Sequence, residues 1–175
     1  MKTSPHEMFP VVDTDGNVIG SATRGECHSG SKILHPVVHL HVVSADGSLL
    51  LQKRAMSKDI QPGRWDTAVG GHVDCGETPF QAVLREAAEE LGIDAAGACF
   101  AGRYVFESSI ERELVHTFYI VVEKHGFTAD FAADEIDEVR FWTQEELRAA
   151  AGGGLLTENF EMEFERILPD ILKKI

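Results

Sequence analysis

Hydrophobic and polar residues alternate along several short segments of the chain. In residues 37–43, the apolar Val38 and Leu40 alternate with His39 and His41, which is the two-residue period of a β-strand. Shorter apolar runs bounded by glycine, proline or aspartate predict further strands in the same way. These further strands are expected at residues 49–53, 65–69, 103–106, 116–122 and 139–142.

The first part of the chain predicts a hairpin. Two apolar runs in residues 9–20 flank Asp15, Gly16 and Asn17, and such residues favour tight turns. Residues 21–36 are rich in glycine, serine and histidine, so they predict a connection. We therefore expect residues 1–36 to form an amino-terminal hairpin extension ahead of the main sheet.

Residues 79–91 change to a helical period. Thr78 is a suitable N-cap residue, Gln81 completes a capping box, Pro79 suits the first helical position, and Gly92 suits the position after the last turn. The expected buried stripe of this helix consists of Phe80, Val83, Leu84, Ala87 and Leu91. The opposite face is acidic, so one face is expected to pack and the other to line a site.

The end of the chain predicts two more helical segments. Thr143 and Glu146 form a second capping box, which starts a short helix that runs to about residue 150. Residues 157–175 carry apolar residues at helical spacing, and Pro169 falls inside this pattern, where a proline kinks or splits a helix. Strands around one central helix, with another helix at the end, predict an α+β domain over residues 1–175, built as an α/β/α sandwich with a mixed central sheet.

Composition narrows the class of protein. Apolar residues make up 43% of the 175 residues, which is enough for one buried core. The net charge of −13 argues against binding to a nucleic-acid backbone or to an anionic membrane. No apolar run approaches the roughly 18 residues of a membrane span, and the amino terminus lacks an apolar signal core. The three cysteines include no CxxC pair, so we expect a reducing, cytoplasmic setting.

The acidic face of the central helix carries the candidate chemistry. Glu86, Glu89 and Glu90 stand at i, i+3 and i+4, so they share one helix face. Like charges at this spacing repel unless a cation lies among them, and oxygen ligands suit Mg²⁺ or Mn²⁺. A solvated acidic face is the plainer alternative. The Gly70–Gly71 pair, which lets backbone approach a ligand, and an arginine able to bridge Glu77 to the helix favour the metal site.

Residues 71–93 resemble the Nudix box. In words, that motif is Gly, five residues, Glu, seven residues, Arg-Glu, an apolar residue, any residue, Glu-Glu, any residue, Gly and an apolar residue, and every fixed position is present here. The resemblance implies metal-dependent attack of water on a diphosphate linked to another group. It implies metal-binding or catalytic roles for Glu86, Glu89 and Glu90, and loop-organising roles for Arg85 and Glu77, with Glu77 close to a further ion.

Residues 11–35 and 49–77 resemble the isopentenyl-diphosphate isomerase branch of Nudix proteins. That resemblance implies a second site for Mn²⁺, Zn²⁺ or Fe²⁺, although the matching residues could equally be surface residues that bind no metal. It also implies that two basic residues, Arg54 and Lys58, contact the diphosphate; solvated surface cations are the alternative. The residues that match the second metal site are His28, His35, His72, Glu111 and Glu113.

The chain departs from the isomerases at the position that performs proton transfer. Those enzymes use a cysteine where this sequence has Gly70, and their box is degenerate, whereas this one is intact. We therefore predict a hydrolase that acts on a nucleoside diphosphate linked to another group or on a related organic pyrophosphate. An isomerase and a non-catalytic nucleotide sensor are the rival hypotheses. The general base is left open among Glu86, Glu89, Glu111, Glu113 and Glu135, and a two-fold homodimer is the default expectation for an oligomer.

Overall fold

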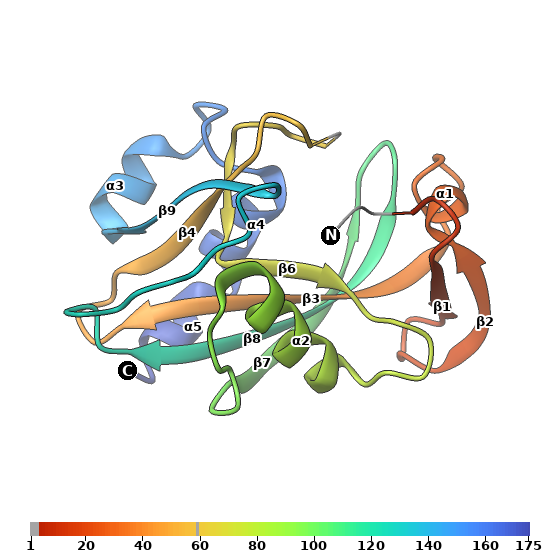
Figure 1. The fold of residues 1–175 in the computed structure, drawn as a ribbon, viewed down its shortest axis with the longest axis horizontal. Helices are drawn as coiled ribbons and strands as arrows, with labels where there is room; N and C mark the ends of the chain where they lie inside the picture. Colours follow the sequence, from red (N-terminus) through yellow and green to blue (C-terminus); the bar gives the residue numbers. More distant parts are fainter. Residues whose placement is uncertain (1–3, 59) are drawn as a thin grey trace.

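Seven strands form one mixed sheet (Figure 1) in the computed structural model, which describes residues 4–58 and 60–175. The strand order is β5-β4-β3-β8-β7, and in addition β6 pairs with β3 and β9 pairs with β4. Strands β3 and β8 run parallel, and the other pairs are antiparallel. The strands are β3 (Leu34–Ser44), β4 (Leu49–Arg54), β5 (Trp65–Thr67), β6 (Val69–His72), β7 (Cys99–Glu107), β8 (Arg112–Val122) and β9 (Ile136–Trp142).

One edge of β3 is shared by two strands. Its first half pairs with β6, where His39 lies opposite Gly70, and its second half pairs with β4, where Val43 lies opposite Leu49. Since β8 occupies the other edge of β3 along its whole length, β4 and β6 must both lie on the remaining edge and separate from one another. This divergence opens the sheet at its centre.

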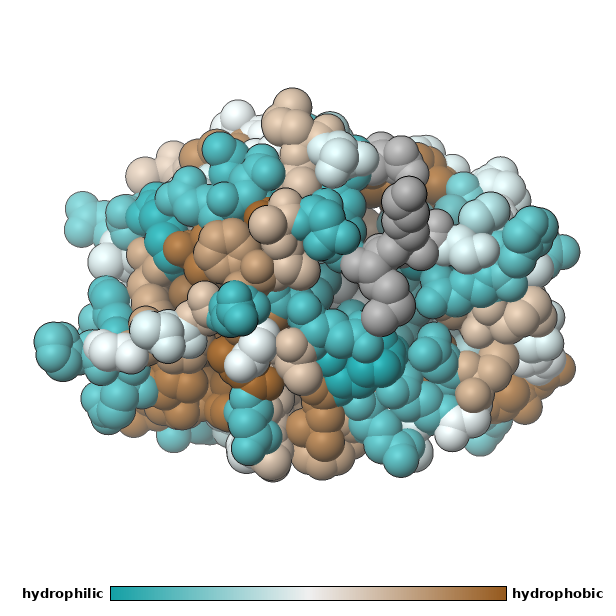
Figure 2. All heavy atoms as spheres, viewed as in Figure 1, coloured by the Kyte–Doolittle hydropathy of each residue, from teal (hydrophilic) through white to brown (hydrophobic). Residues whose placement is uncertain are grey.

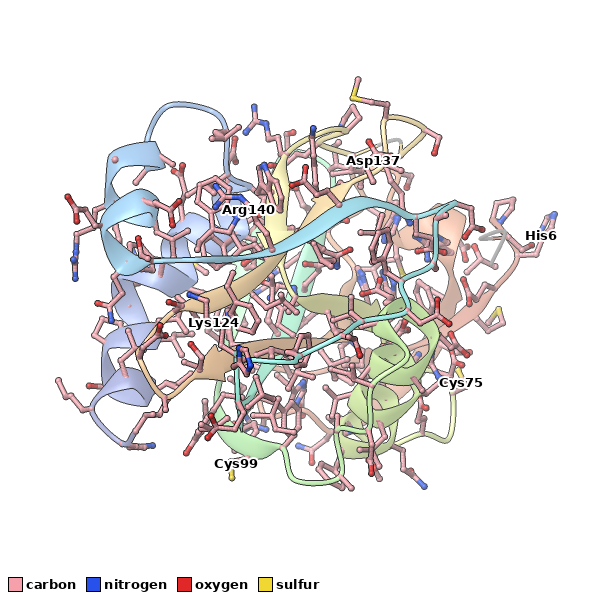
Figure 3. All side chains as sticks on the ribbon, turned by 60° about the vertical axis from the view of Figure 1, so that its left-hand side comes forward. His6, Cys75, Cys99, Lys124, Asp137 and Arg140 are labelled. Carbon is pink, nitrogen blue, oxygen red and sulfur yellow. The ribbon has the colours of Figure 1, made fainter. Side chains whose placement is uncertain are left out.

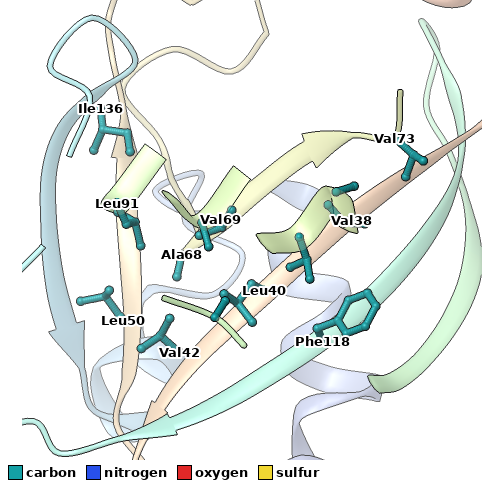
Figure 4. Packing of buried hydrophobic residues seen from close by; sticks show 14 residues of the cluster. Val38, Leu40, Val42, Leu50, Ala68, Val69, Val73, Leu91, Phe118 and Ile136 are labelled. Carbon is teal, nitrogen blue, oxygen red and sulfur yellow. The ribbon is translucent and has the colours of Figure 1, made fainter. Parts of the chain in front are cut away.

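Helices cover both faces of the sheet, which confirms the predicted sandwich (Figure 1). On one face α2 (Pro79–Leu91) packs through Val83, Ala87 and Leu91 onto buried residues of β3 and β6, as Figure 4 shows for the strand side chains. On the other face α4 (Glu158–Arg166) and α5 (Leu168–Leu172) pack with Leu147 of α3 (Gln144–Ala150). The alternation in β3 therefore divides its side chains between two cores.

The amino-terminal segment is more ordered than predicted. Strands β1 (Met8–Val12) and β2 (Val18–Thr23) form the expected hairpin as a separate sheet. The prediction of a plain connection after residue 20 was wrong, because β2 continues to Thr23 and a short helix, α1 (Arg24–Cys27), follows. Thr23 and Glu26 form a capping box that starts this helix, and Phe9 of β1 is fully buried.

One other element differs from the sequence prediction. The expected strand at residues 65–69 is two strands, β5 and β6, which pair with different neighbours.

The helical segment at residues 157–175 is split into α4 and α5, as the position of Pro169 predicts, and Pro169 lies in the first turn of α5. A proline has no backbone N–H to donate, so it is tolerated at a helix start and not inside one.

The central helix buries a slightly different face from the predicted one. Its cap residues Thr78 and Gln81 form the expected capping box, and Gly92 adopts the expected left-handed conformation with a φ of 64°. However, Phe80 is 40% exposed, whereas Glu90 is only 8% exposed. The buried face of the helix is therefore rotated, relative to the predicted face, toward the glutamates. As a result, the carboxylate of Glu90 lies in the interior.

A buried polar network links α4 to the centre of the sheet. Glu163 exposes no surface, and its carboxylate contacts Nδ1 of His39 and Nε2 of His41, both at 3.0 Å, and accepts a hydrogen bond from Thr117 Oγ1 at 2.8 Å. Burial disfavours the ionised carboxylate, but the two imidazoles outweigh this effect and hold the pKa of Glu163 well below its usual value. The histidine pair predicted on one face of β3 therefore faces a buried acid.

Within the described residues, no helix is long and apolar enough to cross a membrane. All three cysteines are free thiols; Cys27 is buried, and Cys75 and Cys99 are exposed (Figure 3).

The network at Glu163 generates a stability prediction. Glu163→Gln keeps the shape of the side chain and removes its charge, so we expect the free energy of unfolding to fall by about 3 kcal/mol, the usual consequence of breaking a buried ion pair. Glu165→Gln, an exposed change on the same helix, should alter it by less than about 0.5 kcal/mol. Urea unfolding of both variants measures the difference, and equal stabilities would contradict the assigned role of the network.

Candidate functional site

A cavity of about 280 Å³ opens where β4 and β6 diverge. Its walls come from strands β3 to β8, from α2 and α4, from the segment that precedes β9 and from the amino-terminal extension, and most of the lining residues are charged or polar. Hydrophilic side chains also gather on the surface over α2 and the loop that leads into it (Figure 2). The lining includes His39, Gln52, Arg54, Lys58, Asp66, Gly70, Gly71, Glu86, Glu89, Glu90, Glu113, Glu135 and Asn159.

All three glutamates of the acidic helix face line this cavity. The Glu86 side chain is 14% exposed and that of Glu89 is 39% exposed, so Glu89 is the more accessible of the two. Gly71 makes room for this arrangement, because a Cβ atom there would lie 2.1 Å from Cδ of Glu86. Any side chain at position 71 would displace the Glu86 carboxylate.

Glu90 is fixed inside the cavity wall. Its Oε2 atom accepts hydrogen bonds from Nε2 of Gln52 at 3.1 Å and from the backbone N–H of Gly70 at 3.2 Å. Burial, reinforced by the nearby charge of Glu86, raises the pKa of Glu90 to about 8. Burial also raises the pKa of Glu86 to about 7, although the adjacent Arg85 opposes the shift. These carboxylates lack enough positive charge around them, and a divalent cation would supply it.

Arg85 organises the loop that precedes α2. Its guanidinium donates two hydrogen bonds to Glu77, at 3.0 and 2.9 Å, and a third to the carbonyl oxygen of His72 at 2.9 Å. It also donates to Oε1 of Glu86 at 2.6 Å. Arg85 thus joins the loop to the acidic helix and orients Glu86. Glu77 has both oxygens engaged with Arg85 and lies outside the cavity lining.

The three predicted histidines come together at this cavity, which His28 and His72 line. Ligand nitrogens of His28, His35 and His72 all lie within 4.8 Å of one another. His35 is fully buried, and its Nδ1 lies 3.0 Å from the carbonyl oxygen of Ile33, so Nδ1 carries the proton and Nε2 carries a lone pair. Among the described residues, no group forms a hydrogen bond with this Nε2. An unpartnered buried lone pair is what a metal ligand requires before the metal binds.

The two predicted carboxylates adjoin these histidines. Oε2 of Glu111 lies 3.5 Å from Nε2 of His28, and Oε1 of Glu113 lies 4.0 Å from Nε2 of His35. Burial lowers the pKa of His28 to about 4 and also lowers the pKa values of His35 and His72, so these rings are neutral at pH 7. Neutral imidazoles together with carboxylates are suitable donors for Mn²⁺, Zn²⁺ or Fe²⁺.

Both predicted substrate-binding cations lie on the cavity wall. NH1 of Arg54 lies 3.2 Å from Oδ2 of Asp66, and Nζ of Lys58 lies 2.6 Å from Oε2 of Glu135. Each cation therefore has a carboxylate partner in the absence of a ligand. A phosphate group that entered the cavity would have to share these cations with Asp66 and Glu135.

Other cavity residues could not be identified from the sequence as parts of a site. Gln52 belongs to a strand with an apolar pattern, and its contact with Glu90 joins elements 38 residues apart. Asp66 alternates with the buried Trp65 and Thr67, so the period of β5 indicates which face it occupies but not what lies there. Asn159 follows a helix N-cap, where a polar residue is unremarkable.

Comparisons with known proteins agree with this geometry. A model of the NUDIX domain family matches residues 33–160. The chain is 34% identical to an uncharacterized Nudix hydrolase of Yersinia pestis, over 93% of both chains. It is 32% identical to an isopentenyl-diphosphate Δ-isomerase of Streptomyces avermitilis, over 80% of this chain and 73% of that protein.

Solved structures show the same fold. The crystal structure of DR0079 from Deinococcus radiodurans superposes with a TM-score of 0.75 at 24% identity and covers 92% of this chain and 99% of its own. The NUDIX domain of Shewanella oneidensis NrtR, solved with ADP-ribose, superposes with a TM-score of 0.61 at 17% identity, over 74% of this chain and 83% of its own. The matched family model, which spans the acidic helix and most of the cavity lining, shows that this chain belongs to the Nudix hydrolase family.

Proposed function

We propose that this protein hydrolyses a diphosphate bond in a nucleoside diphosphate linked to another group, or in a related organic pyrophosphate, with Mg²⁺ or Mn²⁺ as cofactor. The observation that carries this proposal is the convergence of Glu86, Glu89 and Glu90 on one cavity, where burial disfavours the charge of two of them. Such a cluster is costly for the fold unless it binds a cation.

Glu86, Glu89 and Glu90 are the residues that would hold the metal. A divalent cation bound there would neutralise phosphate charge and make a water molecule easier to deprotonate. Gln52 and the backbone of Gly70 keep Glu90 in place, and Arg85 keeps Glu86 in place. The protein therefore prepares the carboxylate positions before the substrate arrives.

The reaction itself is a substitution at phosphorus. The oxygen of a water molecule forms a bond to one phosphorus atom, and the bond from that phosphorus to the bridging oxygen breaks. A carboxylate takes the proton of the water. Glu86 and Glu89 inside the box remain candidates for this base, and so do Glu111, Glu113 and Glu135 outside it, because all five line the cavity. Arg54 and Lys58, which also line the cavity, would bind phosphate oxygens, and an arginine fork suits a phosphate.

The isomerase hypothesis is less consistent with the cavity. Proton transfer at carbon requires an acid or base beside the substrate, and position 70, where the isomerases have a cysteine, is a glycine with no side chain. Incubation with isopentenyl diphosphate separates the hypotheses, since an isomerase yields a double-bond isomer and a hydrolase releases phosphate or a monophosphate. Tight nucleotide binding with no turnover would favour a sensor.

We also propose that the histidine cluster holds a second metal ion such as Mn²⁺, Zn²⁺ or Fe²⁺. The unpartnered Nε2 atom of the buried His35 supports this proposal. His28 follows α1, whereas His35 lies in β3 and His72 ends β6. A metal at this point would therefore fasten the amino-terminal extension to the main sheet. Two carboxylates would complete the donor set: Glu113 lies near the start of β8, and Glu111 immediately precedes that strand.

Neutralising either Glu86 or Glu90 should abolish most of the activity. We expect Glu86→Gln and Glu90→Gln each to lower kcat on an organic pyrophosphate by at least about 100-fold, because a charged metal ligand is lost. Glu138→Gln, an exposed change on β9, is the matched control and should keep wild-type activity. Product release under Mg²⁺ or Mn²⁺, followed by mass spectrometry, provides the measurement. Activity of either variant within a few-fold of wild type would exclude the assignment.

Metal affinity should depend on pH in a defined direction. Since the pKa values of Glu86 and Glu90 are raised to about 7 and about 8, both groups are largely protonated at pH 6 and must release protons to bind Mg²⁺. We therefore expect the Kd for Mg²⁺ to rise by at least about tenfold between pH 8.5 and pH 6. Calorimetry at the two pH values measures it, and an unchanged Kd would mean that these carboxylates are already ionised at pH 6.

The second metal site can be tested by metal content. Wild-type protein and His35→Ala are both equilibrated with Mn²⁺ or Zn²⁺, and the excess metal is then removed. The wild-type protein should retain about one metal ion per protein molecule more than His35→Ala retains. His125→Ala, an exposed histidine change, should match the wild type. Elemental analysis gives the metal content, and the same metal content in His35→Ala and wild type would refute the proposed site.

A further inference from the structure

The imidazole of His39 lies between a buried carboxylate and the cavity. Its Nδ1 atom is 3.0 Å from Oε2 of Glu163, and the residue, 9% exposed, lines the cavity. The opposite edge of the ring faces Gly70, the cross-strand neighbour of His39. A Cβ atom at position 70 would lie 3.5 Å from Cδ2 and 3.7 Å from Nε2 of the ring. The absence of a side chain there leaves this edge of His39 uncovered.

The network behind the ring fixes which nitrogen faces the cavity. Glu163 is fully buried and ionised, so it accepts the proton of His39 Nδ1 and orients the ring. Thr117 and His41 occupy other acceptor positions of the same carboxylate. Among the described residues, no hydrogen bond is made by Nε2 of His39, which leaves that atom for a ligand in the cavity.

The charge around the ring favours a donor at Nε2. Burial lowers the pKa of His39, but the carboxylate of Glu163, with smaller contributions from Asp66 and Glu113, outweighs burial and raises the pKa to about 9. A ring protonated on both nitrogens cannot bind a metal ion and is a charged hydrogen-bond donor. The ligand that suits it is therefore an anion.

His39 differs in this respect from the other cations of the cavity. Arg54, Lys58 and Arg85 each have a charged nitrogen within 3.2 Å of a carboxylate oxygen. NH1 of Arg24, which also lines the cavity, lies 3.4 Å from Oε2 of Glu7. The Nε2 edge of His39 has no such partner within the described chain, because its carboxylate lies behind the ring at Nδ1. It can bind an incoming phosphate without giving up an existing contact.

We propose that His39 donates a hydrogen bond from Nε2 to a phosphate oxygen of the substrate, with Glu163 acting as a positioning residue that holds the ring in that orientation. This role rests on the proposed function, since it takes the diphosphate as the ligand of the cavity. In this role, His39 provides a phosphate contact from β3, whereas the acidic residues come from α2.

His41 provides a matched control for this role. It lies on the same strand and the same face, and its Nε2 atom is 3.0 Å from the same Oε2 atom of Glu163. It is only 1% exposed and lies outside the cavity lining. His39→Gln and His41→Gln therefore each remove one imidazole from Glu163, but only the first removes a donor from the cavity.

The test is binding of methylenediphosphonate, a diphosphate analogue that is not hydrolysed, in the presence of Mg²⁺. Calorimetry should show that His39→Gln binds the analogue at least about tenfold more weakly than wild type, since a hydrogen bond to a charged group is lost. His41→Gln should bind within twofold of wild type, and thermal unfolding records the stability of both variants. Equal affinities for the two variants would overturn the proposal.

A second measurement on the wild-type protein does not depend on the folding of any variant. Nitrogen-15 NMR of the histidine side chains should show that the analogue shifts the Nε2 resonance of His39 and leaves those of His41 unchanged. An unchanged His39 resonance at saturation, or no binding of the analogue by the wild type, would overturn the proposal. Neither experiment requires turnover. If no organic pyrophosphate were hydrolysed while the His39 effect persisted, the proposed function would fail and this inference would stand.

Discussion

Glu86 and Glu90 stand one helical turn apart, and the charge of Glu86 disfavours the ionised form of Glu90. Both are largely removed from water, which raises their pKa values toward neutrality. The fold holds them there by fixed contacts, namely a side-chain amide and a backbone N–H on Glu90 and a guanidinium on Glu86. Burying these carboxylates is unfavourable unless a positive charge offsets the electrostatic cost. A divalent cation that binds together with a diphosphate is the combination that suits the cavity.

The rest of the architecture serves the space in front of these carboxylates. Since β4 and β6 share one edge of β3, the sheet must open where they part, and side chains from both faces reach the same cavity. Helix α2 brings the acids from one side. On the other side, helix α4 carries Glu163, and this carboxylate orients the ring of His39. The amino-terminal extension adds His28 and closes the histidine cluster near the same opening.

Short sequence patterns were enough to predict the central helix and its acidic face. The capping box of Thr78 and Gln81, the left-handed Gly92 and the spacing of the three glutamates are all properties of one short segment, and the structure has the helix where they place it. The contact of His39 with Glu163 spans 124 residues, so no local pattern could reveal it. The exposure of Phe80 was mispredicted for a similar reason, because tertiary packing decides which side of an apolar stripe is covered. The division of residues 65–69 into two strands depends on partners far away in the sequence.

The central claim is that the acidic face of α2 binds a divalent cation in this cavity. Crystals soaked in Mn²⁺ test it most directly, because anomalous scattering locates the metal without assumptions about its ligands. The account predicts an anomalous peak among Glu86, Glu89 and Glu90, about 2.0–2.3 Å from at least two of their carboxylate oxygens. Carboxylates that turn away from one another at saturating Mn²⁺, with no anomalous density between them, would contradict it.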